Sequence, residues 1–191
     1  MTWDCTRITN GLVGVKCNEP TIPGTGSRVI LINYSDIDRK LSTIEDNVIT
    51  LLALKQGLKG YEFVSLNNSI VGEISYNKTT YFGNWQHDLT LRIFAKNDEA
   101  KKFVNKLNGS LVVAVVENKE NGPNGEVKYE LYGWDAGLEL NEATAATEMA
   151  ESVVYQFKLG SGTNSKESSL PKSVFKTDLT QTEDMLNSLV A

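Results

Sequence analysis

The chain has 191 residues, of which 40% are hydrophobic and 23% charged, and its net charge at pH 7 is -5. This apolar content suffices for one folded core and excludes wholesale disorder. No apolar run approaches the ~20 residues of a membrane-spanning helix, so we expect a soluble protein without a membrane anchor. The acidic composition and the lack of a cluster of Lys and Arg also argue against a protein that binds nucleic-acid phosphates.

Residues 1–27 show little hydrophobic periodicity and contain Pro20 and Pro23. We predict an extended N-terminal arm that becomes ordered only by docking on another surface. Its first residues lack the apolar stretch of a signal peptide, so secretion by that route is not expected. Cys5 and Cys17 are the two cysteines of the chain. We expect free thiols, with a disulfide as the alternative in an oxidising setting.

The next part of the chain is rich in short alternating runs. They predict strands over 28–34, 47–54, 61–66 and 70–76. A polar connection over 35–46 joins the first two strands. The last two flank Asn67 and Asn68, a pair typical of a tight turn, so we predict that they form a hairpin.

A longer strand over 82–95 leads into a predicted helix over 97–108. Leu89, Leu91 and Ile93 share one face of the strand. Asn97 is a suitable helix cap, and Gly109 supplies a left-handed exit. Further strands are predicted over 111–116, 126–133, 137–142 and 152–159. The continuous apolar run 111–116 predicts a strand buried on both faces.

The end of the chain predicts a C-terminal helix over 179–191. Thr180 and Glu183 have the spacing of a capping box, in which each side chain accepts a backbone N–H of the other residue. The apolar stripe that includes Met185, Leu186 and Leu189 is expected to pack on the domain or on a neighbour.

Few residues suit catalysis or metal binding. His87 is the sole histidine, and we expect it to be partly exposed on its strand; no nucleophile stands in a G-x-S-x-G elbow. Asp36 and Asp38 lack the spacing of a calcium loop, and the G-x-G at residues 24–26 lacks the lysine of a P-loop. We therefore predict that the protein is not an enzyme and uses no cofactor or metal.

The order of long strand, helix, apolar strand, Gly-rich loop and strand resembles the tail tube proteins of bacteriophages. The resemblance covers residues 47–177. It lies in the segments HDLTLRIF (87–94), LVVAVVE (111–117), YELYGWDAGLEL (129–140) and LPKSVF (170–175). These segments look like tail structural proteins of phages that infect gut Bacteroidales.

The resemblance implies a mainly β protein with one or two helices. Residues 28–178 would form an antiparallel β-sandwich or half-barrel, between the arm over 1–27 and the helix over 179–191. Such proteins assemble into stacked rings, commonly hexamers, whose inner strands join into one barrel around a lumen. The acidic composition suits a conduit through which DNA slides without binding.

The implied function is that of a virion structural protein located in the tail and assembled in the host cytoplasm. Its partners would be further copies of itself, other tail proteins, and DNA that passes through the lumen without specific binding. A tail ring, neck or adaptor protein that does not polymerise is one alternative. A carbohydrate-binding β-sandwich module is another.

Subunit contacts are expected from the two segments that bury little apolar surface by themselves, the arm over 1–27 and the connection over 35–46. The candidate interface residues are Ile22, Pro23, Asp36, Asp38, Arg39, Leu41 and Ile44.

Overall fold

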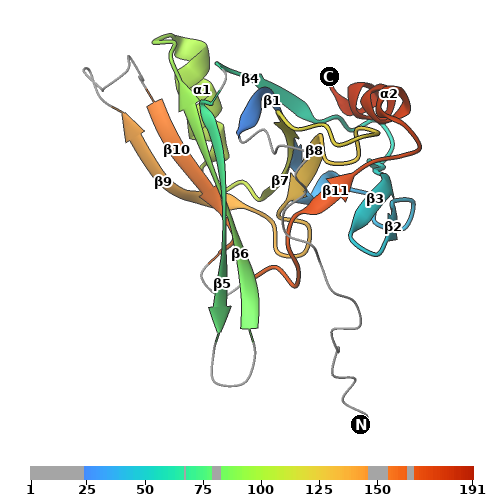
Figure 1. Cartoon of the computed structure of the whole chain (residues 1–191). Coiled ribbons are helices and arrows are strands. Elements are labelled where there is room, and N and C mark those ends of the chain that lie inside the picture. The colour runs from blue at the N-terminus through green and yellow to red at the C-terminus, as the bar shows by residue number, and fades with distance from the viewer. Residues whose placement is uncertain (1–23, 67, 79–82, 146–154, 163–165) are drawn as a thin grey trace.

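The computed structural model describes residues 24–66, 68–78, 83–145, 155–162 and 166–191 (Figure 1). One group of strands comprises β1 (Thr25–Asn33), β2 (Thr43–Glu45), β3 (Val48–Leu51), β4 (Tyr61–Val64), β7 (Val112–Asn118), β8 (Tyr129–Tyr132) and β11 (Lys172–Val174). A second group comprises β5 (Ile70–Lys78), β6 (Gly83–Ile93), β9 (Glu139–Ala145) and β10 (Tyr155–Gly160). The helices are α1 (Asp98–Leu107) and α2 (Leu179–Leu189), with the 3-10 turn η1 at Tyr34–Asp36.

The strands form two sheets, which confirms the prediction of a mainly β fold. The seven-stranded sheet has the order β2-β3-β11-β8-β7-β1-β4, and the four-stranded sheet the order β5-β6-β10-β9. Neither sheet closes into a barrel. The sheets are not wholly antiparallel, because β11 runs parallel to β3.

Two hydrophobic cores lie on opposite sides of the seven-stranded sheet. The first core fills the space between the two sheets, and the second lies between the seven-stranded sheet and α2. Strand β7 serves both cores, since Val112 and Ala114 belong to the first and Val113 and Val115 to the second. The prediction that this apolar run is buried on both faces is therefore confirmed.

Helix α1 closes one end of the first core and agrees with the sequence pattern. The Asn97 side chain accepts a hydrogen bond from the Ala100 N–H at 2.8 Å. Gly109 leaves the helix at a φ of 76°, the left-handed region that favours glycine. Phe103 and Leu107 belong to the apolar face that packs on the core.

The predicted hairpin between residues 61–66 and 70–76 is wrong. Strand β4 pairs with β1, whereas β5 pairs with β6 in the other sheet. The chain crosses between the sheets here, and Asn68 has the positive φ of 64° that suits such a bend. Both runs alternate apolar and polar residues, as strands do, but each pairs with a longer apolar strand. Strand β5 aligns with β6 from Ile70 to Lys78.

The predicted capping box of the C-terminal helix is also wrong. The cap is Asp178, whose carboxylate accepts the Gln181 N–H at 2.8 Å. Thr180 lies inside the helix, and Glu183 instead pairs with Lys128 at 3.1 Å. The helix starts early because Leu179 packs against the second core. Its apolar stripe packs on the chain's own domain through Met185, Leu186 and Leu189.

Several predicted boundaries shift. Strand β8 starts at Tyr129 because the preceding residues form a turn closed by the Lys128 N–H and the Gly125 carbonyl. The connection over 35–46 contains the end of η1 and the strand β2. Residues 25–27 belong to β1 and not to the N-terminal arm, whose residues 1–23 lie outside the described part of the chain.

The observed helix cap can be tested with one pair of variants. We expect Asp178→Ala to lower the free energy of unfolding by about 1 kcal/mol, because the Gln181 N–H loses its acceptor. Thr180→Ala is the matched control and should change it by less than about 0.5 kcal/mol, since Thr180 is an exposed residue within the helix. Urea denaturation followed by circular dichroism measures both. A larger loss of stability in Thr180→Ala than in Asp178→Ala would instead support the capping box.

Candidate assembly surface

The four-stranded sheet has one apolar and one polar face. Leu89 and Leu91 of β6 align with Leu159 and Phe157 of β10, and all four side chains are buried in the first core. The residues between them point the other way. That opposite face carries Glu73, Ser75, Asn77, Asn84, Gln86, Asp88, Thr90, Arg92, Gln156, Lys158, Glu142 and Thr144.

Carboxylates outnumber cations on this polar face. The carboxylates are Glu73, Asp88, Glu139 and Glu142, and the cations are Arg92 and Lys158. Glu139 belongs to this face because it lies opposite Gly160, which itself aligns with Asp88. The Lys158 ammonium lies 3.0 Å from an Asp88 oxygen and 3.6 Å from a Glu73 oxygen. The hydrogen bond to Asp88 is the main reason that the pKa of Lys158 is raised. Lys158 is thus already neutralised within the sheet, which leaves the face negative.

Strands β5 and β9 form the two edges of this sheet, and no other described strand pairs with the outer side of either. All three neighbouring pairs in the sheet are antiparallel. With four alternating strands, β5 and β9 therefore run in opposite directions. An edge of this kind presents unpaired N–H and C=O groups to any strand that approaches it.

The hydrogen-bond phase identifies which edge groups point outward. The Arg92 N–H donates to the Ser69 carbonyl, and the Ser161 N–H donates to the His87 carbonyl. The backbone N–H and C=O groups of the even-numbered residues of β6 therefore point toward β5, and those of the odd-numbered residues point toward β10. Counting across the ladders, the outward groups are those of Gly72, Ile74 and Tyr76 on β5 and of Ala143 and Ala145 on β9.

The two edges are staggered along the strand direction. Gly72 of β5 is level with Leu140 of β9 across the intervening strands. From that level β5 continues to Lys78, whereas β9 starts at Glu139. In the other direction β9 reaches Ala145, whereas β5 starts at Ile70. A stagger of this kind is what tilted strands need when a sheet closes into a barrel.

His87 joins this sheet to the loop that follows β8, and it is buried, contrary to the prediction of partial exposure. Its Nδ1 accepts the Gly133 N–H at 3.3 Å, which leaves Nε2 to donate to the Ser169 carbonyl at 3.0 Å. Burial lowers the pKa of His87 from 6.5 to about 4. The neutral ring is therefore the form that holds the loop.

Glu167 holds the same loop from the other side. Its carboxylate accepts the Asp135 and Ala136 N–H groups, each at 2.8 Å. The side chain is buried, and burial raises the pKa of Glu167. The residue is also tied to β6 by two backbone bonds with Trp85. His87 and Glu167 thus position the N-terminal half of β6 against the seven-stranded sheet.

Hydrogen bonds and aromatic contacts within the chain hold the connection over 35–46 in place. The Asp38 carboxylate accepts the N–H groups of Lys40 and Leu41, and the Asp36 carboxylate accepts a bond from Asn33. The Arg39 guanidinium lies over the rings of Tyr34 and Trp134, 4.6 and 4.4 Å from their centres.

Leu41 and Ile44 are the other candidate interface residues in the described part of the chain. Leu41 is 62% exposed, and Ile44 is half-buried against the second core. Ile22 and Pro23 lie outside the described residues. A role of these seven residues in subunit contacts stays a prediction. The sheet edges were not among them, although the alternation of residues 70–76 already marked a strand with a polar face.

The chain matches no protein-family model, no curated protein and no solved structure. Within the described residues, no three His, Cys, Asp or Glu side chains gather as a metal site would require. None of the described helices is long and apolar enough to cross a bilayer. The functional argument therefore depends on the geometry of the four-stranded sheet.

The burial of His87 predicts a loss of stability in acid. In the unfolded chain the imidazole binds a proton near pH 6.5, but in the folded chain only near pH 4, so stability falls as the pH drops through this window. We expect the free energy of unfolding to be about 3 kcal/mol lower at pH 4 than at pH 7 from this residue. Urea denaturation at a series of pH values measures it.

His87→Gln is the control for this effect. Its stability at pH 7 should already be reduced, but the part of the pH dependence that belongs to His87 should disappear. Glu167, with its raised pKa, acts in the opposite direction and is present in both proteins. Equal pH dependence in the two proteins would show that His87 is not buried in the neutral form.

Proposed function

We propose that the protein is the subunit of a bacteriophage tail tube, in which copies join edge to edge through β5 and β9 into rings that stack. The polar face of the four-stranded sheet would line the lumen, and the seven-stranded sheet would lie outside it. The observation that carries the proposal is the four-stranded sheet itself, with one polar face and two edges of opposite direction to which no other described strand pairs. The resemblance of residues 47–177 to tail tube proteins agrees with it.

The directions of the edges favour a closed ring. Rotation about an axis along the strands keeps every strand direction, so β9 of one copy meets β5 of the next in an antiparallel pair. Such a contact joins two different surfaces and closes into a ring when the rotation divides a full turn. Monomeric proteins protect their edges with Pro, Lys or bulges. Strand β9, with the sequence ELNEATA, carries neither Pro nor Lys, and its register shift at Asn141 precedes the outward residues Ala143 and Ala145.

The dimensions favour about six copies if the lumen is to hold DNA. Six four-stranded sheets give a barrel of 24 strands. At about 4.8 Å between strands and a tilt of about 40°, this barrel is about 48 Å across between backbones. Three copies would give about 24 Å, which side chains would largely fill. Only the larger barrel leaves room for a duplex.

The charge of the polar face fits a conduit better than a binding site. Four carboxylates and two cations face the proposed lumen in each copy, and Lys158 is already paired with two of the carboxylates. Phosphates would be repelled from such a wall, so DNA would slide without being held.

The edge contact can be tested with two substitutions at Ala143, whose N–H points outward from β9. Ala143→Pro removes this donor without removing a bond of the β9–β10 ladder, so we expect a folded protein that no longer forms rings. Ala143→Val keeps the donor and suits a strand, so rings should persist. Negative-stain electron microscopy and sedimentation velocity distinguish rings from monomers.

Circular dichroism and thermal unfolding serve as the controls for folding of both variants. Unstacked rings of the wild-type protein would favour a tail ring or neck protein. A wild-type protein that stays monomeric at high concentration, or Ala143→Pro rings equal to those of the wild type, would contradict assembly through β9.

A further inference from the structure

Three Asn-Gly pairs lie in the described part of the chain. They are Asn108-Gly109, Asn121-Gly122 and Asn124-Gly125. A fourth pair, at residues 10–11, lies outside the described residues. In such a pair the backbone nitrogen of the glycine can attack the side-chain amide of the asparagine, because no Cβ atom shields that nitrogen. The surroundings of each pair therefore determine whether it reacts.

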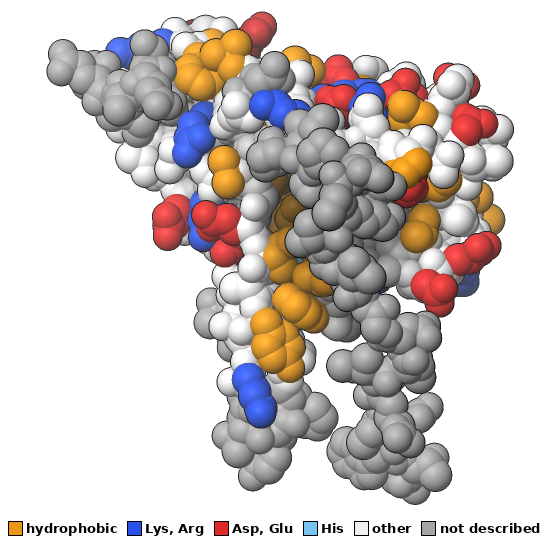
Figure 2. All heavy atoms as spheres, in the orientation of Figure 1, with side chains coloured by type: hydrophobic (Ala, Val, Ile, Leu, Met, Phe, Trp, Pro, Cys, Tyr) orange, Lys and Arg blue, Asp and Glu red, His pale blue; other side chains and the backbone are white. Residues whose placement is uncertain are grey.

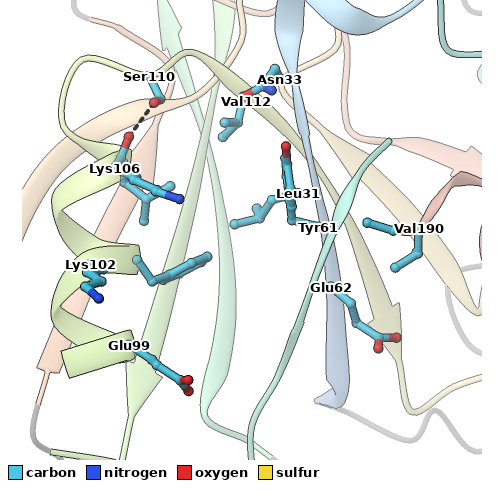
Figure 3. Close-up of a pocket in the computed structure, with 13 residues that line it drawn as sticks. Leu31, Asn33, Tyr61, Glu62, Glu99, Lys102, Lys106, Ser110, Val112 and Val190 are labelled. Carbon is cyan, nitrogen blue, oxygen red and sulfur yellow. Dashed lines mark hydrogen bonds between the residues drawn. The ribbon is translucent and has the colours of Figure 1, made fainter. Parts of the chain in front are cut away.

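The first pair follows α1 and is open to solvent. It lies in the upper part of the molecule, where Figure 2 shows exposed Lys and Arg side chains. In Figure 3 the Ser110 hydroxyl bonds to the Lys106 carbonyl at this end of α1, and the Ser110 N–H donates to the Leu107 carbonyl at 3.1 Å. Asn108 and Gly109 are exposed, and a Cβ atom on Gly109 would meet no atom within 4 Å beyond its neighbours in sequence.

Both reacting groups of this pair are free. Among the described residues, neither the Gly109 N–H nor the Asn108 side chain has a hydrogen-bond partner. Gly109 has a φ of 76°, and no contact restricts rotation of the peptide toward the Asn108 side chain. The glycine nitrogen can therefore reach the side-chain amide without disturbing the core.

The third pair is fixed by packing. Gly125 is buried, and a Cβ atom there would lie 2.9 Å from the Leu179 Cβ, so the glycine packs against the start of α2. Its carbonyl accepts the Lys128 N–H at 3.2 Å, and the Asn124 N–H donates to the Glu126 carboxylate at 2.8 Å. The glycine nitrogen could reach the Asn124 side chain only if this turn opened.

The second pair lies beside a negative charge. Asn121 is exposed, but a Cβ atom on Gly122 would lie 3.0 and 3.1 Å from the two carboxylate oxygens of Glu126. The glycine nitrogen must lose its proton before it attacks, and a neighbouring carboxylate disfavours the anion that results. The last two turns of α1 instead carry three lysines and no carboxylate, and Lys106 offsets the negative end of the helix dipole.

We propose that Asn108 is a site of spontaneous covalent modification, at which a succinimide forms and opens to aspartate and isoaspartate. The deprotonated Gly109 nitrogen attacks the Asn108 Cγ, the bond from Cγ to Nδ2 breaks, and ammonia leaves with the proton. Water then adds to one of the two imide carbonyls and reopens the ring. One ammonia is lost and one water gained, with no oxidant or enzyme. The reaction needs no partner, so it holds whether or not the protein forms rings.

Both products change the end of α1. Each adds a negative charge, and isoaspartate also lengthens the main chain between α1 and β7 by one carbon atom. The Ser110 bonds to the Lys106 and Leu107 carbonyls depend on the spacing of the chain over these residues. Isoaspartate therefore removes the hydrogen-bonded turn that ends α1.

Peptide mapping of the aged protein tests the order of the three pairs. The full-length protein is kept in warm, mildly alkaline buffer, and its peptides are followed by mass spectrometry and by labelling with isoaspartyl methyltransferase. We expect Asn108 to convert at least several-fold faster than Asn121 and Asn124. In concentrated urea the three rates should become similar, because the unfolded chain exposes every pair. Conversion of Asn108 no faster than that of the other two in the folded protein would overturn the proposal.

Two variants test the reasons for this order, with circular dichroism as the control for folding. Glu126→Gln removes the charge beside Gly122 and should speed conversion of Asn121 several-fold without changing Asn108. Asn108→Gln keeps an amide but needs a larger ring, so it should remove the fast isoaspartate signal and leave the slow ones. A fast signal that persists in Asn108→Gln, or an unchanged rate at Asn121 in Glu126→Gln, would contradict the assignment.

Discussion

The alternation of β6 and β10 is the constraint on which the rest of the structure depends. Leu89, Leu91, Phe157 and Leu159 fill the first core, and burying each side chain contributes about 1.5–3 kcal/mol. A shift of one residue would turn all of them outward and bring Asp88 and Lys158 inward, so only one register is stable. The apolar face thus determines the polar face. It also determines which backbone groups point outward at the two edges, because the hydrogen-bond phase follows from the same register.

Local patterns were sufficient for the elements whose stability is local. Helix α1 could be predicted because Asn97 caps it and Gly109 ends it within a few residues of sequence. The double burial of β7 follows from an unbroken apolar run. The partners of β4 and β5 could not be predicted, because sheet pairing depends on strands distant in sequence, and a plausible Asn-Asn turn does not outweigh the longer ladder with β6. The cap at Asp178 was missed because a capping-box spacing two residues later was equally good locally.

The candidate site was harder to predict than the fold, for a related reason. The connection over 35–46 has a composition that suggests dependence on a neighbour. Some of its polar groups have partners within the domain, in the Asp38 turn and at the Arg39 guanidinium between two aromatic rings, and its role in subunit contacts stays a prediction. The polarity of His87 suggested exposure, yet both ring nitrogens have partners inside the protein, and a satisfied polar group can be buried. Free edges leave no trace in composition, because they are a property of topology.

The proposed ring would depend on weak contacts that act together. The outward residues of β5 and β9 allow about four backbone hydrogen bonds between neighbours, each contributing about 1 kcal/mol net. Association of two proteins costs at least about 4 kcal/mol in lost freedom of motion, so an isolated edge contact is close to neutral. Closing the proposed ring would add a contact without the loss of another free molecule. If the proposed ring is correct, the chain would therefore stay dispersed at low concentration and assemble cooperatively, since each contact alone is too weak to persist.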